Sequence, residues 1–171
     1  MLKRIEYMHS QHFLHRDIKP TNILVGSGKK NNLFYLIDFG LAKRYINPRT
    51  GAHIMPKEEK GMLGDKLFRS ALAHAGSETS RKCELEALGY MLVYFLRGGT
   101  LPWNMECPNL LEIEKYDMRR WDKEESNKKR IKKWNIEVAN WKKNISADEL
   151  CEGLPDIIWK YVEYVNNLTF F

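Results

Sequence analysis

Apolar residues near the start of the chain recur every three or four positions, which predicts a helix over residues 2–9. Leu2, Ile5 and Met8 carry this spacing, and side chains three or four residues apart share one face of a helix. Met1 leads directly into the pattern, without a residue that usually starts a helix, such as Ser, Thr, Asp or Asn. We therefore expect the sequence to begin inside a structural element.

Two short runs rich in β-branched and aromatic residues follow, at residues 23–25 and 34–37. The residues between them, Gly-Ser-Gly-Lys-Lys-Asn-Asn, have the composition of a turn. The two runs therefore predict a β-hairpin. Glycine and proline then recur through residues 39–82 and break any period, which predicts a long loop.

The next segment, residues 84–96, is apolar on almost every side, which is typical of a helix buried in a core. Gly98 and Gly99 follow it directly and predict its end. The expected body is therefore mostly helical, with one small hairpin.

Two further helices are predicted near the end of the chain. Ser146 and Glu149 have the spacing of a capping box, which opens a short helix that Gly153 closes. Asp156 is placed to cap the last helix. One face of that helix carries Ile158, Val162 and Val165.

Length and composition indicate one globular domain. The chain has 171 residues, of which 43% are hydrophobic and 29% charged, and it shows neither a signal peptide nor a transmembrane run. Cys83, Cys107 and Cys151 have no C-x-x-C spacing, so we expect neither disulfides nor a zinc site, and predict a cytoplasmic or nuclear location.

The net charge of +6 arises from residues 115–143, because Lys/Arg and Asp/Glu balance elsewhere. Helical spacing places five apolar residues of this region on one face: Ile131, Trp134, Val138, Trp141 and Ile145. The remaining faces are basic: Lys128, Lys129, Arg130, Lys132, Lys133, Lys142 and Lys143. We favour a helix that packs its Trp face on the body and leaves its lysines in water. Alternatively, the basic helix 128–143 binds an acidic or helical partner, a membrane surface or nucleic acid; DNA-specific binding is not predicted.

Two motifs carry the chemistry. His15-Arg16-Asp17-Ile18-Lys19-Pro20-Thr21-Asn22 matches the H-R-D-x-x-x-x-N catalytic loop of protein kinases, and Asp38-Phe39-Gly40 matches their D-F-G. Phosphoryl transfer depends on positioning and on neutralising negative charge with metal ions. We expect Asn22 and Asp38 to supply oxygen ligands to Mg²⁺, and Asp17 to accept the proton of the substrate hydroxyl.

The stretches H-R-D-I-K-P-T-N-I-L-V-G, Y-L-I-D-F-G-L-A-K-R-Y and S-R-K-C-E-L-E-A-L-G-Y resemble the casein kinase I family of Ser/Thr protein kinases. The resemblance covers nearly the whole chain except an insertion at about 108–143. It implies a protein-kinase-like α+β fold of which residues 1–171 form the mostly helical C-terminal lobe, with ATP and Mg²⁺ as cofactors and proteins as substrates.

The resemblance also implies roles for three further residues. Lys19 would contact the transferring phosphate, and Leu24 and Ile37 would form the floor of the adenine pocket. Each has a simpler interpretation: Lys19 as a solvated charge, and Leu24 and Ile37 as core residues of the hairpin.

The sequence departs from the family pattern in several places. The 171 residues contain no G-x-G-x-x-G loop, no V-A-I-K lysine and no helix with its glutamate partner. We therefore expect this chain to lack the N-terminal ATP-binding lobe, to bind Mg-ATP poorly and to expose apolar surface.

Three single residues also depart from the family pattern. Glu84 replaces an aspartate, and its longer side chain would shift the catalytic loop. Asp65 replaces a threonine and would repel Asp17. Leu67 replaces a phosphate-binding arginine, which puts recognition of primed substrates in doubt.

Two hypotheses follow. The first is a Ser/Thr kinase that transfers the ATP γ-phosphoryl group to protein hydroxyls, of which this chain is a part. The second is a catalytically inactive kinase lobe that binds partner proteins.

Overall fold

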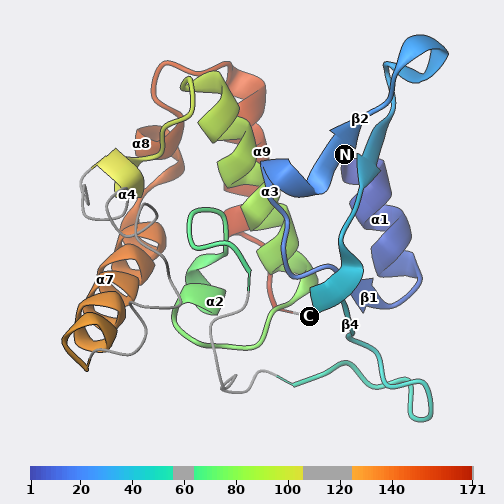
Figure 1. The fold of residues 1–171 in the computed structure, drawn as a ribbon, viewed down its shortest axis with the longest axis horizontal. Coiled ribbons are helices and arrows are strands. Elements are labelled where there is room, and N and C mark those ends of the chain that lie inside the picture. Colours follow the sequence, from blue (N-terminus) through green and yellow to red (C-terminus); the bar gives the residue numbers. More distant parts are fainter. Residues whose placement is uncertain (56–63, 106–124, 171) are drawn as a thin grey trace.

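The computed structural model describes residues 1–55, 64–105 and 125–170. A helical body surrounds the long helix α3, and a small hairpin projects beside α1 (Figure 1). This arrangement confirms the predicted mostly helical fold with one hairpin. The described helices are α1 (Leu2–Ser10), α2 (Ala71–His74), α3 (Arg81–Leu96), α4 (Pro102–Met105), α7 (Glu125–Asn144), α8 (Ala147–Cys151) and α9 (Asp156–Asn166).

The predicted hairpin is confirmed as the antiparallel pair β2 (Ile23–Val25) and β3 (Phe34–Leu36), in which Leu24 lies opposite Tyr35. A second antiparallel pair, β1 (Phe13–Leu14) with β4 (Lys43–Arg44), was not predicted. The expectation of an unbroken loop over residues 39–82 is therefore wrong in part, since that range also contains α2. Elements this short have too few residues to show a period.

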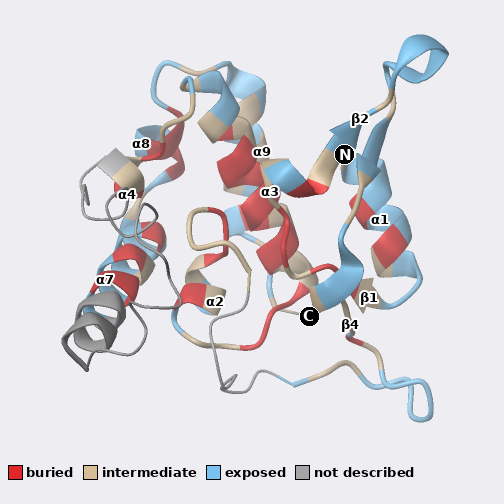
Figure 2. Cartoon of the chain, viewed as in Figure 1, coloured by how far each residue is buried: buried red, intermediate tan, exposed pale blue. Residues whose placement is uncertain are grey.

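Helix α3 forms the centre of the core, as its apolar sequence predicts. Most residues of α3 are buried (Figure 2), and α9 packs against it, with Val162 in the shared core. A Cβ added at Gly89 would lie 3.3 Å from the Tyr161 ring, so the glycine permits this close approach. The helix ends at Leu96, before Gly98 and Gly99, which both have positive φ.

Two boundaries differ from those predicted. Helix α3 begins at Arg81, three residues before the predicted start. Asp156 is the first residue of α9 rather than its cap, because Pro155 occupies the cap position; a carboxylate in the first turn still interacts favourably with the helix dipole. The capping box of Ser146 and Glu149 is confirmed, since both of its hydrogen bonds are present.

Helix α7 packs beside α2 and α4 (Figure 1). Trp134 and Val138 are buried, as the packing interpretation predicts, whereas Trp141 is partly exposed. Lys142 was expected in water but is buried, because its ammonium group binds backbone carbonyls of the body. Residues 108–124 of the predicted insertion, and the side chain of Ile131, lie outside the part that the structure describes.

No helix within the described ranges is both long and apolar enough to cross a bilayer.

Candidate active site

The Asp17 carboxylate is held at both of its oxygen atoms and is only 8% exposed. Oδ1 accepts a hydrogen bond from the backbone amide of Asp65 at 2.9 Å. Oδ2 accepts from the Asn22 side-chain amide at 3.0 Å and pairs with the Lys19 ammonium at 2.8 Å. The orientation of the carboxylate is therefore fixed by three groups from two segments of the chain.

Lys19 forms a direct ion pair with Asp17 and is three-quarters buried, so it is not a solvated surface charge. Burial alone would lower the pKa of the Lys19 ammonium. The hydrogen bond to Asp17 and the charges of Asp17, Asp65 and Asp38 outweigh burial, and the pKa is raised. Lys19 therefore stays positively charged at neutral pH and directs that charge at the site.

Asn22 and Asp38 are brought together by the hairpin. The amide of Ile37 donates to the Asn22 carbonyl at 3.0 Å, which places the next residue, Asp38, beside Asn22. Asp38 has a left-handed backbone, with φ of 62°, and its Oδ1 accepts from the Gly40 amide at 3.1 Å. Asp tolerates this conformation better than most residues, and its carboxylate caps the turn formed by Phe39–Leu41.

The donor set fits a Mg²⁺ ion that shares its coordination with phosphate. The Asn22 amide nitrogen is bonded to Asp17, and within the described residues the Asn22 Oδ1 atom accepts no hydrogen bond. No group of three or more His, Cys, Asp or Glu side chains in the described ranges could hold a metal. A cation at Asn22 and Asp38 therefore needs further oxygens from a ligand or water, as Mg²⁺ does in phosphoryl-transfer sites.

Leu24 and Ile37 lie on the hairpin above these residues. Leu24 is 50% exposed, so it is not a core residue of the hairpin. Ile37 is partly buried, and its carbonyl accepts a hydrogen bond from His15 Nε2 at 2.9 Å. Other exposed apolar side chains on or just after the hairpin are Val25, Phe34, Tyr35 and Phe39.

Glu84 supports the backbone of the catalytic loop. Its Oε1 atom accepts from the Arg16 amide at 2.6 Å, and its Oε2 atom lies 2.7 Å from His9 Nε2. Arg16 has a positive φ of 68°, a strained conformation that is retained only where neighbouring groups enforce it. The longer glutamate side chain therefore joins the loop to α1 as well as to α3.

Asp65 meets Asp17 through its amide and not through its carboxylate. Its Oδ1 atom accepts instead from the Leu67 amide at 2.8 Å, and the expected repulsion between the two carboxylates stays a prediction. Gly64 makes this approach possible, because it has a φ of 80° and a Cβ there would lie 2.5 Å from the Arg16 carbonyl oxygen.

Sequence reasoning did not single out Glu78, which lies fully buried next to the catalytic loop. Its Oε2 atom is 2.6 Å from Lys43 Nζ and its Oε1 atom is 3.9 Å from Arg16 Nη1. It sits in the range predicted as a loop, with no motif to mark it. Glu78 thus connects the segment before α3 to the catalytic loop and to β4.

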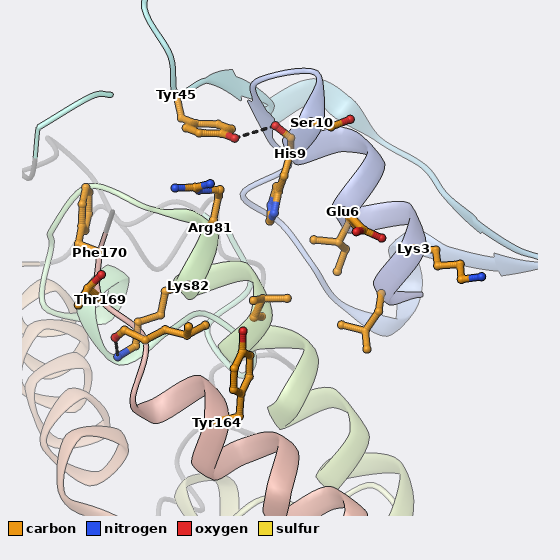
Figure 3. A pocket seen from close by; sticks show the side chains of 14 residues that line it. Lys3, Glu6, His9, Ser10, Tyr45, Arg81, Lys82, Tyr164, Thr169 and Phe170 are labelled. Atoms are coloured by element: carbon orange, nitrogen blue, oxygen red, sulfur yellow. Dashed lines mark hydrogen bonds between the residues drawn. The ribbon is translucent and has the colours of Figure 1, made fainter. Parts of the chain in front are cut away.

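A separate groove of about 610 Å³ lies between α1, α3 and the C-terminal segment (Figure 3). Its walls include Tyr45, whose hydroxyl donates to the His9 carbonyl, and Lys82, which binds the carbonyl of Leu168. None of the residues predicted for catalysis or cofactor binding lines this groove. The predicted site residues lie instead on the catalytic loop, the hairpin and the residues that directly follow it.

The protein kinase domain family model matches residues 1–154. The chain therefore belongs to the protein kinase family, whose members transfer a phosphoryl group from ATP to protein substrates with the help of Mg²⁺.

Proposed function

We propose that the chain is the C-terminal lobe of a Ser/Thr protein kinase of the casein kinase I type. The observation that carries the catalytic part is the Asp17 carboxylate, oriented at both oxygens beside Lys19 and Asn22. The Ser/Thr preference and the subfamily rest on the sequence H-R-D-I-K-P-T-N and the other stretches that resemble casein kinase I.

Each residue has a role that its contacts support. Asp17 accepts the proton of the acceptor hydroxyl and keeps that oxygen in line for attack. Lys19 places its positive charge next to Asp17, where charge develops on the phosphoryl group. Asn22 and Asp38 would hold Mg²⁺, which neutralises phosphate charge when bound. Leu24 and Ile37 supply apolar surface for the adenine ring.

The assignment to one lobe is supported by two observations. The 171 residues contain no glycine-rich loop or strand lysine for the nucleotide phosphates, and the hairpin and α1 present exposed apolar side chains beside the site. We expect these residues alone to bind Mg-ATP weakly. A dissociation constant near 1 μM by calorimetry, roughly −8 kcal/mol, would contradict this.

The test of catalysis is Asp17→Asn, assayed by phosphate transfer to a Ser/Thr peptide array at millimolar Mg-ATP. Loss of the base should lower the rate by about 100-fold or more, without changing the thermal unfolding temperature greatly. Asp156→Asn is the matched control, since Asp156 is exposed at the start of α9. An Asp17→Asn rate equal to wild type would overturn the assignment, and transfer to tyrosine alone would overturn the Ser/Thr preference.

A further inference from the structure

Lys142, in the last turn of α7, lies inside the body and is only 5% exposed. Its ammonium group contacts three backbone carbonyls of one short segment: Arg69 at 2.6 Å, Leu67 at 3.0 Å and Lys66 at 3.5 Å. Three donors on one nitrogen suit three acceptors, which a neutral or apolar side chain could not satisfy together.

Aromatic rings complete the surroundings of this ammonium group. It lies 4.9 Å from the centre of the Tyr90 ring and 4.7 Å from the Trp103 ring. The Trp103 indole also donates to the Leu67 carbonyl at 3.0 Å. Helices α3, α4 and α7 thus converge on residues 66–69.

Burying this ammonium group is unfavourable for the free energy of folding. Within the described residues no carboxylate forms an ion pair with Lys142. Burial lowers the pKa of its ammonium well below the ordinary value, and the charge of Arg69 adds to this, whereas the charges of Glu86 and Asp65 act in the opposite direction. A buried cation without an ion-pair partner destabilises a fold compared with an apolar side chain of similar size. Filling space between helices therefore does not explain a lysine here.

The segment that Lys142 binds leads directly to the catalytic carboxylate. Asp65 precedes it and donates its amide to Asp17 Oδ1. The amides of Leu67 and Arg69 both bond back to Asp65. Residues 65–69 thus form a short structural unit. Its first residue contacts Asp17, and the carbonyl groups of the residues that follow bind the Lys142 ammonium.

We propose that Lys142 is a positioning residue, which holds residues 65–69 as the surface that receives the acceptor peptide beside Asp17. This inference rests on the proposed kinase function, because the peptide must bring its hydroxyl to Asp17. Lys142 itself touches neither the nucleotide site nor the Asp17 carboxylate.

The test compares Lys142→Met with Lys143→Met, a matched control on the exposed side of α7. Hydrogen exchange measures the Leu67 and Arg69 amides directly. We expect Lys142→Met to speed their exchange by about tenfold or more, the equivalent of one lost hydrogen bond, with α3 amides unchanged. In the kinase assay, KM for the acceptor peptide should rise by a similar factor while KM for ATP stays constant.

Several outcomes would overturn the proposal. One is unchanged exchange at residues 67 and 69; another is an equal acceleration in α3, which would show a purely global effect. A rise in KM for ATP would contradict a role confined to the peptide. Should Lys142→Met not fold, Lys142→Arg keeps the cation and its donors. Its exchange must then stay within about tenfold of wild type, and faster exchange would reject the proposal.

The exchange experiment needs no phosphate transfer, so a failure of this proposal can be distinguished from a failure of the proposed kinase function. An Asp17→Asn rate equal to wild type would overturn the proposed function and leave the support of residues 65–69 to be judged by exchange.

Discussion

The Asp17 carboxylate shows how a residue common in loops acquires a defined orientation. Its two oxygens face different partners, the Asp65 amide on one side and the pair Lys19 and Asn22 on the other. The catalytic motif predicts the identity of Asp17, Lys19 and Asn22 but not the amide of Asp65. This contact could not be predicted, since a sequence does not say which part of a residue faces a neighbour.

The close approach of residue 64 to the catalytic loop gives a prediction at the same scale. Gly64→Ala should destabilise the chain, because φ is 80° and the new Cβ would meet the Arg16 carbonyl. Gly51→Ala is the control, since Gly51 also has a positive φ, of 68°, with nothing within 4 Å. We expect Gly51→Ala to cost about 1 kcal/mol and Gly64→Ala about 2 kcal/mol more, measured by urea unfolding. Equal costs would show that the close approach is unimportant.

Among the contacts between elements, the one between α2 and α7 contains a buried histidine. His74 at the end of α2 packs edge-on against Trp134 at 5.7 Å and lies 3.4 Å from Lys142. Burial, together with the charges of Lys142 and Arg69, lowers the pKa of His74 to about 2. The imidazole therefore remains neutral in the folded chain at any ordinary pH.

This neutral histidine makes stability depend on pH. Below pH 6.5 the unfolded chain takes up a proton at His74 that the folded chain does not, so the free energy of unfolding falls by about 1.4 kcal/mol per pH unit from this group. His74→Gln removes the effect. Between pH 6.5 and pH 5, wild type should lose about 2 kcal/mol more than the variant. Urea unfolding at the two pH values measures the difference, and parallel losses would contradict the buried neutral state.

Elements with a distinct local sequence pattern were predicted well, and elements without one were not. The spacing in α1, the apolar α3 and the turn between β2 and β3 all follow from local sequence. Strands β1 and β4 have two residues each and depend on pairing across the chain. Lys142 was misplaced because helical periodicity assigns a face to each residue but cannot reveal carbonyl groups that a neighbouring segment offers.

At the scale of the whole molecule, exposed apolar side chains lie on α1, on the hairpin and just after it. Tyr7, Val25, Phe34 and Phe39 are all exposed, and a groove of about 660 Å³ runs between α1 and the hairpin. Surfaces of this kind usually contact something else. The sequence predicted such a surface from the missing nucleotide-binding elements, though not which residues would form it.

The 171-residue chain on its own should therefore bind a hydrophobic dye and self-associate. Val25→Lys combined with Phe34→Glu should reduce both, because the two residues lie opposite each other on the hairpin and the new charges can pair. Ile157→Lys is the control, as Ile157 is equally exposed but lies on α9. Dye fluorescence and sedimentation velocity measure the effect. A wild-type chain that is monomeric and binds no dye would show that this surface does not drive self-association.

The position of Lys142 along the chain has a genetic consequence. All the residues proposed for catalysis and cofactor binding lie between residues 17 and 38, whereas the ammonium that binds residues 66–69 comes more than a hundred positions later. A stop codon or a skipped exon between codons 41 and 142 would leave both catalytic motifs intact. The shortened product would nevertheless lose the support for the strip beside Asp17, so an intact motif is not a sufficient criterion for annotating a splice variant of this gene as active.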